Sequence, residues 1–268
     1  MSNRPIGVFD SGLGGLTAVR EMLKVMPGTD IVYFGDTGRV PYGTRSKETI
    51  IRYTRQNIRF LKQFNIKALL IACGTASSAA LPQVCGDEDF PIIGVVESAA
   101  KKAVEVTRNR RIGIIGTKAT VKSGAYERVI KELNGEIFTV AQACPLFVPL
   151  VENARISEDD KILKLAVEEY LTPVRDAGVD TLILGCTHYP IISRAIAEFM
   201  GDGIELVNPG REAARYLSTL PELKGNKDNE AKTRFFVSDD VDAFSHSASM
   251  FLGDEIGERV ELVNIESF

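Results

Sequence analysis

Short apolar runs alternate with longer amphipathic stretches along most of the chain, and Gly, Pro or Asp bounds many of the runs. Runs rich in Val, Ile and Leu are typical of strands, whereas apolar residues at helical spacing, as in residues 47–64 and 211–220, indicate helices. We expect strands at residues 6–9, 31–34, 68–72, 91–96, 112–115, 181–185, 204–207 and 234–237. This alternation predicts an α/β fold in which mostly parallel sheets are flanked by helices.

Two stretches of the first half have counterparts in the second half. R-P-I-G-V-F-D-S at residues 4–11 resembles R-R-I-G-I-I-G-T at 110–117, and K-A-L-L-I-A-C at 67–73 resembles D-T-L-I-L-G-C at 180–186. Apolar residues dominate all buried parallel strands, so the cysteine that ends both strands is the informative feature.

The duplication predicts two similar lobes with an active site in the cleft between them. One lobe would comprise residues 1–97 plus 207–268, because residues 211–220 and 234–237 are expected to return to it. The other would comprise residues 98–206.

Cys73 and Cys186 are candidate functional residues because of their position at strand ends. In open α/β sheets ligands bind outside the carboxyl ends of the strands, where the following turn presents backbone N–H groups. Small or hydroxylated residues suited to a tight turn follow both cysteines, namely Gly74, Thr75 and Thr187. Two lobes that face each other would place one thiol on each side of the cleft.

Ionisable residues accompany both thiols. A free thiol has a pKa of about 8.5 and needs assistance to act as a base near neutral pH. Asp10 ends the first strand, so we expect it at the same sheet edge as Cys73, where it can accept the thiol proton. His188, one of only 2 histidines, follows Cys186 by two residues and can act in the same way. A strand-end Asp is often only a helix cap, but its place beside a candidate thiol favours a catalytic role.

Composition narrows the class of protein. The 268 residues include 32 basic and 36 acidic ones, and a net charge of −4 predicts neither a nucleic-acid nor a membrane partner. A secretory signal and an apolar run of roughly 18 residues are both missing, so we expect a cytoplasmic protein with free thiols. We interpret Cys85 and Cys144 as small structural hydrophobes, the common fate of an intracellular cysteine. No C-x-x-C pair is present, and we expect no metal.

The glycines after Asp10 resemble a dinucleotide-binding sequence only in part. D-S-G-L-G-G-L-T contains Gly12, Gly14 and Gly15, but Thr17 occupies the third position of G-x-G-x-x-G. Asp36 at the end of the second strand is placed like a ribose-binding acid, although strand-end acids are common in this fold. We therefore expect no nucleotide cofactor.

Four motifs in the same order resemble the glutamate racemase family. They are D-S-G-L-G-G-L at residues 10–16, V-P-Y-G-T-R-S at 40–46, A-C-G-T-A-S at 72–77 and G-C-T-H-Y-P at 185–190. The resemblance implies a bacterial enzyme that interconverts L- and D-glutamate without pyridoxal phosphate and supplies D-glutamate for peptidoglycan. It also implies a homodimer.

Site residues follow from the same resemblance. One of the thiols Cys73 and Cys186 would remove the Cα proton while the other delivers a proton to the opposite face. Asp10 would assist Cys73, and His188 would assist Cys186, with Glu152 as a further acid on that side. The residues implied in substrate binding are Asp10, Ser11, Tyr42, Gly43, Gly74, Thr75, Thr187 and His188. Turns at these positions offer neutral hydroxyls and backbone N–H groups to the substrate carboxylates.

The chain departs from the family at Gly74, where the family sequence usually reads A-C-N-T. The side-chain amide is lost and the backbone N–H remains. The motif therefore predicts the type of reaction more strongly than the identity of the substrate. Aspartate or another small amino acid is the leading alternative substrate. A two-lobed ligand-binding protein or a thiol hydrolase with a Cys–His pair are alternatives of other classes.

Overall fold

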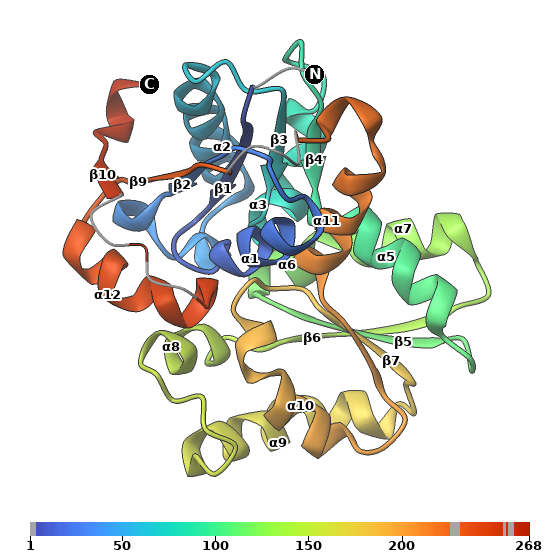
Figure 1. Cartoon of the computed structure of the whole chain (residues 1–268). Helices are drawn as coiled ribbons and strands as arrows, with labels where there is room; N and C mark the ends of the chain where they lie inside the picture. The colour runs from blue at the N-terminus through green and yellow to red at the C-terminus, as the bar shows by residue number, and fades with distance from the viewer. Residues whose placement is uncertain (1–3, 226–230, 254–255, 257–259) are drawn as a thin grey trace.

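The computed structural model describes residues 4–225, 231–253, 256 and 260–268. Within these residues the strands form two separate sheets, both shown in Figure 1. The first sheet has the order β10-β9-β2-β1-β3-β4. Its strands are β1 (Ile6–Asp10), β2 (Ile31–Gly35), β3 (Ala68–Ile71), β4 (Ile92–Gly94), β9 (Thr233–Val237) and β10 (Val260–Leu262).

The second sheet has the order β6-β5-β7-β8. Its strands are β5 (Arg111–Gly116), β6 (Phe138–Ala143), β7 (Thr181–Leu184) and β8 (Glu205–Val207). Every strand pair in both sheets is parallel. The central strands β1, β3 and β7 are buried along their whole length, as strands covered on both faces must be. The predicted α/β fold with two parallel sheets is confirmed.

Helices connect the parallel strands and cover the sheets. They are α1 (Leu16–Val25), α2 (Lys47–Lys62), α3 (Gly74–Ala79), α4 (Leu81–Val84), α5 (Val95–Val106), α6 (Lys118–Ser123), α7 (Ala125–Leu133), α8 (Phe147–Glu152), α9 (Lys161–Asp176), α10 (Ser193–Met200), α11 (Pro209–Thr219) and α12 (Val241–Leu252). In Figure 1, α9 and α10 lie on one side of the second sheet, while α5 and α7 lie on the other.

The C-terminal part of the chain returns to the first sheet, as expected. Strand β9 pairs with β2 from Ile31↔Thr233 to Gly35↔Val237. Helix α11 packs against both α1 and α5. The lobe boundaries near residues 97 and 207 stay a prediction, and α5 spans the first of them.

The strand predicted at residues 91–96 is too long. Only Ile92–Gly94 is a strand, and α5 begins at Val95. Residues 95–106 read V-V-E-S-A-A-K-K-A-V-E-V, so their helical spacing outweighs the β-branched pair at the start. Strands β6 and β10 were not predicted, because their alternating or exposed positions lack a buried apolar run.

No helix within the described ranges is both long and apolar enough to cross a bilayer.

Candidate active site

Both candidate thiols follow buried strands at the carboxyl edges of the two sheets. Strand β3 ends at Ile71, and β7 ends at Leu184, each two residues before a cysteine. Cys73 is the N-cap of α3, where its Sγ accepts a hydrogen bond from the backbone N–H of Ala76 at 3.5 Å. The strand ends therefore fix both sulfur atoms, and Cys73 is further held by a helix terminus.

One cavity of about 320 Å³ is lined by both Cys73 and Cys186. Seven predicted site residues other than the two cysteines also line it: Ser11, Tyr42, Gly43, Gly74, Thr75, Thr187 and His188. Glu152 is a lining residue as well, whereas Asp10 lies outside the lining and is fully buried. The volume suits a small ligand held between the two sheets.

The Cys73 side of the cavity keeps its thiol protonated. The thiol donates a hydrogen bond to the Ser11 hydroxyl at 3.5 Å. Burial, and then the negative charge of Asp10, raise the pKa of Cys73 to about 12. At neutral pH this sulfur is therefore a proton donor.

Asp10 bridges the two lobes and has no hydrogen bond to Cys73 in the described structure. Its carboxylate accepts hydrogen bonds from the Gly12 backbone N–H at 2.9 Å and from the Thr187 hydroxyl at 3.4 Å. Burial raises the pKa of Asp10, while the charge of His188 and the bond from Gly12 oppose that rise. The acid thus interacts with residues of both cavity sides.

The Cys186 side carries a hydrogen-bonded histidine. His188 Nδ1 lies 3.9 Å from the Cys186 sulfur, and its Nε2 lies 3.0 Å from Glu152 Oε1. Burial alone lowers the pKa of His188, but the hydrogen bonds with Cys186 and Glu152 outweigh it and raise the pKa to about 10. At neutral pH the imidazole is therefore cationic and can donate to both partners.

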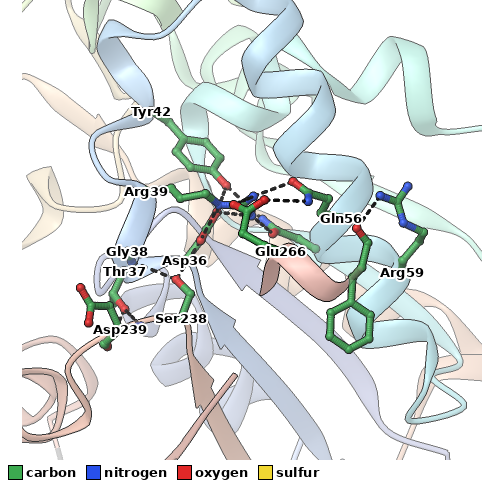
Figure 2. A network of polar contacts seen from close by, with 12 residues as sticks. Asp36, Thr37, Gly38, Arg39, Tyr42, Gln56, Arg59, Ser238, Asp239 and Glu266 are labelled. Atoms are coloured by element: carbon green, nitrogen blue, oxygen red, sulfur yellow. Dashed lines mark hydrogen bonds and ion pairs between the residues drawn. The ribbon is translucent and has the colours of Figure 1, made fainter. Parts of the chain in front are cut away.

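Tyr42 lines the cavity with its hydroxyl turned into a buried network. The hydroxyl donates a hydrogen bond to Asp36 and accepts one from the Asn57 side chain at 3.2 Å. Figure 2 shows the Tyr42 side chain extending toward Asp36 and Arg39. Its phenol is therefore occupied, which leaves the backbone of this turn to face a ligand.

Three polar lining residues, Thr44, Thr117 and Lys118, were missed by the sequence reasoning. Thr117 donates or accepts a 2.9 Å hydrogen bond with Thr75, and Lys118 follows it at the start of α6. The internal repeat could have identified Thr117, since it aligns with Ser11. Lys118 is the one Lys or Arg among the lining residues and carried no sequence signal. Cys144, interpreted as structural, is buried and also lines the cavity.

Glycines allow the lobes to approach closely around the cavity. A Cβ atom on Gly74 would lie 2.3 Å from the backbone oxygen of Gly185, and one on Gly43 would lie 2.8 Å from Thr117 Cβ. Any side chain at these two positions would force the lobes apart. The Gly74 that departs from the family pattern is thus a contact point between the two sheet edges.

The arrangement suits proton transfer on two sides of one ligand. A neutral thiol and a thiol beside an imidazolium line the same cavity, so one sulfur can give a proton while the other takes one. Among the described residues no cluster of three or more His, Cys, Asp or Glu side chains is placed to hold a metal.

Comparisons with known proteins agree with this geometry. A family model described as Asp/Glu/hydantoin racemase matches residues 11–217. Glutamate racemase of Geobacter metallireducens is 43% identical over 98% of each chain. The crystal structure of glutamate racemase from Francisella tularensis in complex with D-glutamate has a TM-score of 0.92 at 37% identity and full coverage of both chains. That of the Thermus thermophilus enzyme with β-chloro-D-alanine has a TM-score of 0.88 at 38% identity.

Proposed function

This chain belongs to the Asp/Glu/hydantoin racemase family, and on that premise we propose that it is a glutamate racemase that interconverts L- and D-glutamate. The main support is the pair of strand-end thiols that line one cavity. Proteins named glutamate racemase that are similar to this chain over almost its full length add to that support. The family assignment supports racemisation in general, and the glutamate racemases at about 40% identity support the substrate.

We propose that Cys73 and Cys186 act as the two bases. With the substrate Cα between them, the thiolate form of one cysteine takes the Cα proton as the thiol of the other donates a proton to the opposite face. The electron pair of the broken C–H bond stays on the substrate until the second proton arrives, so both the atoms and the charge balance. After one turnover the protonation states of the two sulfurs are exchanged, and the enzyme is ready for the reverse reaction.

His188 and Asp10 are proposed to assist the two thiols. A cationic His188 stabilises negative charge on the Cys186 sulfur, and Glu152 holds its ring through the opposite nitrogen. Asp10 raises the pKa of Cys73 through its charge, which makes that sulfur a stronger base once it has lost its proton. His188 therefore acts on its thiol through a positive charge, and Asp10 acts through a negative one.

Glutamate brings two carboxylates, and the cavity lining offers both neutral donors and Lys118 to bind them. Neutral donors of Ser11, Gly43, Thr75 and Thr187 can bind one end of the substrate and leave the charge of the attacking thiolate intact. Lys118 can attract the distal carboxylate. These contacts are proposals, as is the loss of an amide contact at Gly74.

A glutamate racemase would supply D-glutamate to peptidoglycan synthesis, which takes place from cytoplasmic precursors. We therefore propose a role in cell-wall biogenesis and cell shape, a cytoplasmic location and a homodimer. Sedimentation of the purified protein would test the dimer independently of activity.

The direct test is Cα exchange in deuterated water. The protein is incubated with L-glutamate, L-aspartate or L-alanine, and loss of the Cα proton is followed by NMR together with optical activity. We expect exchange and loss of optical activity with glutamate alone. Exchange with aspartate in place of glutamate would replace the substrate assignment, and exchange with none would leave a binding protein.

A further inference from the structure

A buried polar network begins directly beside the cavity. Asp36, at the end of β2, is fully buried, and Arg39 is almost so. The two form an ion pair in which Arg39 Nη2 lies 2.8 Å from Asp36 Oδ2, and Arg39 Nε also donates to both carboxylate oxygens. Figure 2 shows this pair at the centre of the network. Neither residue lines the cavity.

Both terminal nitrogens of the Arg39 guanidinium donate hydrogen bonds to side chains of α2. Its Nη1 donates to Gln56 Oε1 at 2.5 Å, and its Nη2 donates to Asn57 Oδ1 at 3.1 Å. The Arg39 guanidinium also stacks on the Tyr53 ring, 4.1 Å from the ring centroid. Buried charges need such complete pairing, because an unpaired one costs several kcal/mol.

The C-terminal part of the chain closes the network from the other side. The Ser238 hydroxyl, just after β9, donates to Asp36 Oδ1 at 2.8 Å and accepts from the Gly38 backbone N–H at 2.9 Å. Glu266 accepts from Arg39 Nη1 at 3.3 Å and from Gln56 Nε2 at 3.4 Å. Residues some 200 positions away in sequence thus hold the segment that follows β2.

That segment leads straight into the cavity wall. Residues 40–44 all line the cavity, and apart from the short 3₁₀ turn Tyr42–Thr44 they have no regular structure. The Tyr42 hydroxyl, bound to Asp36, anchors the middle of this loop. The loop is therefore tied to one buried carboxylate just before its start, through Arg39, and at its middle, through Tyr42.

We propose that Asp36 and Arg39, together with Ser238 and Glu266 from the C-terminal part of the chain, are positioning residues that hold the loop 40–44 in its substrate-binding form. The inference rests on the proposed function, since the substrate is taken to be glutamate. None of the four residues contacts the cavity, so their effect on catalysis passes through the loop.

A loosened loop should change KM and kcat in different ways. When an anchoring hydrogen bond is removed, the loop occupies its binding form for a smaller fraction of the time, and the apparent dissociation constant rises by the inverse of that fraction. Saturating substrate restores the binding form, so kcat changes little. A role limited to stability would lower the melting temperature and leave KM unchanged well below it.

The experiment uses single substitutions at the edge of the network, because Asp36→Asn would leave a buried cation. Ser238→Ala, Glu266→Gln and Tyr42→Phe are compared with the parent protein in glutamate racemisation at a temperature where all remain folded. We expect KM to rise roughly two- to tenfold, as fits one lost hydrogen bond, with kcat within about twofold. Tyr42→Phe is expected to give the largest rise, and Glu266→Gln, whose side chain is largely exposed, the smallest.

Two control variants match these changes. Tyr53→Phe removes a hydroxyl next to the network for which the described residues provide no hydrogen bond, and Ser267→Ala does the same beside Glu266. Hydrogen exchange by mass spectrometry is measured on the peptide that spans residues 37–46. Faster exchange confined to this peptide in the test variants supports the inference. An unchanged KM in Ser238→Ala and Tyr42→Phe would overturn it, and activity of the parent protein keeps that failure separate from failure of the proposed function.

Discussion

The two sides of the cavity share a backbone plan and differ in the position of their ionisable groups. On the first side the strand β1 ends at Asp10 and is followed by Ser11, whereas β5 ends at Gly116 and is followed by Thr117. After the cysteines the difference is reversed, since Gly74 and Thr75 follow Cys73, while Thr187 and His188 follow Cys186. A carboxylate precedes one thiol along the sheet edge, and an imidazole follows the other.

Similar lobes can surround their thiols with opposite charges. Burial and then the negative charge of Asp10 raise the pKa of Cys73 and keep its thiol protonated, whereas the group beside Cys186 is a cationic imidazole. In the proposed two-base mechanism, these unlike neighbours suit one proton donor and one proton acceptor. Two identical surroundings would give equal thiols, and two-sided transfer needs them in opposite protonation states.

Removal of either sulfur is the strongest test of the comparison. Cys73→Ala and Cys186→Ala are each expected to lower racemisation by roughly 10⁴-fold, the upper end for loss of an acid/base group. Circular dichroism of the variants checks that the fold is intact. Cα exchange from each separate enantiomer then shows which side each cysteine serves. Retained exchange from the same enantiomer in both variants would contradict opposed thiols.

Substitution of His188 or Asp10 should lower kcat/KM less than loss of a cysteine, and by the same factor for both enantiomers. We expect His188→Asn to lower kcat/KM by roughly 10²–10³-fold, and Asp10→Asn by less, because Asp10 has no hydrogen bond to Cys73. The free enantiomers have equal energies, so kcat/KM must fall by the same factor for L- and D-glutamate. The separate kcat values are expected to change unequally. Equal kcat changes in both directions for both variants would remove the distinction between the two sides.

The lobe contact at Gly74 can be tested by adding one methyl group. Gly74→Ala places a Cβ 2.3 Å from the Gly185 backbone oxygen, so the sheet edges must separate. We expect kcat/KM to fall by about ten- to a hundredfold, since a displacement of about 1 Å can cost about 10²-fold. Gly86→Ala is the matched control, because its Cβ would meet no atom within 4 Å. Equal activity of the two variants would mean that the lobe distance does not limit the reaction.

The smallest expected effect is a dependence of stability on pH at Cys73. The folded protein holds this thiol with a pKa of about 12, whereas an unfolded thiol titrates near about 8.5. The contribution of this protonated, buried thiol to the free energy of unfolding is fully present below pH of about 8.5 and is lost as the pH rises towards 12. Urea unfolding of the parent and of Cys73→Ser at pH 8, 9 and 10 should therefore show the parent losing stability faster, by at most about 1.4 kcal/mol per pH unit. Parallel curves would contradict the raised pKa.

Buried strands were the part of the fold that the sequence predicted well. β3 and β7 are unbroken apolar runs, and burial on both faces produces that pattern. β6 was missed because Phe138 is exposed and the rest of the strand is only partly buried, as at an edge. The six-residue α3, G-T-A-S-S-A, is held by its buried position and by Cys73 at its N-cap, and its sequence has little helix propensity.

Contacts between segments far apart in the sequence were beyond what the sequence could predict. The motifs predicted both cysteines and His188 at strand ends that meet, and all three line the cavity; their roles in catalysis stay a prediction. That Asp10 binds Thr187, or that Ser238 binds Asp36, depends on packing of segments far apart in sequence. Asp36, which is placed in the sequence like a ribose-binding acid, binds Arg39 and Ser238 inside the protein.

The pairing of β9 with β2 has a consequence for how the chain is made. A ribosome releases the protein from its N-terminus, so every strand of the second sheet has emerged by residue 207, before β9 exists. Until residues 233–237 appear, β2, with its sequence I-V-Y-F-G, presents an unpaired apolar edge, the kind of edge that recruits other chains. The lobe whose synthesis begins first is therefore completed last. During synthesis, the edge of β2 stays unpaired until β9, some 200 residues later in the chain, is made.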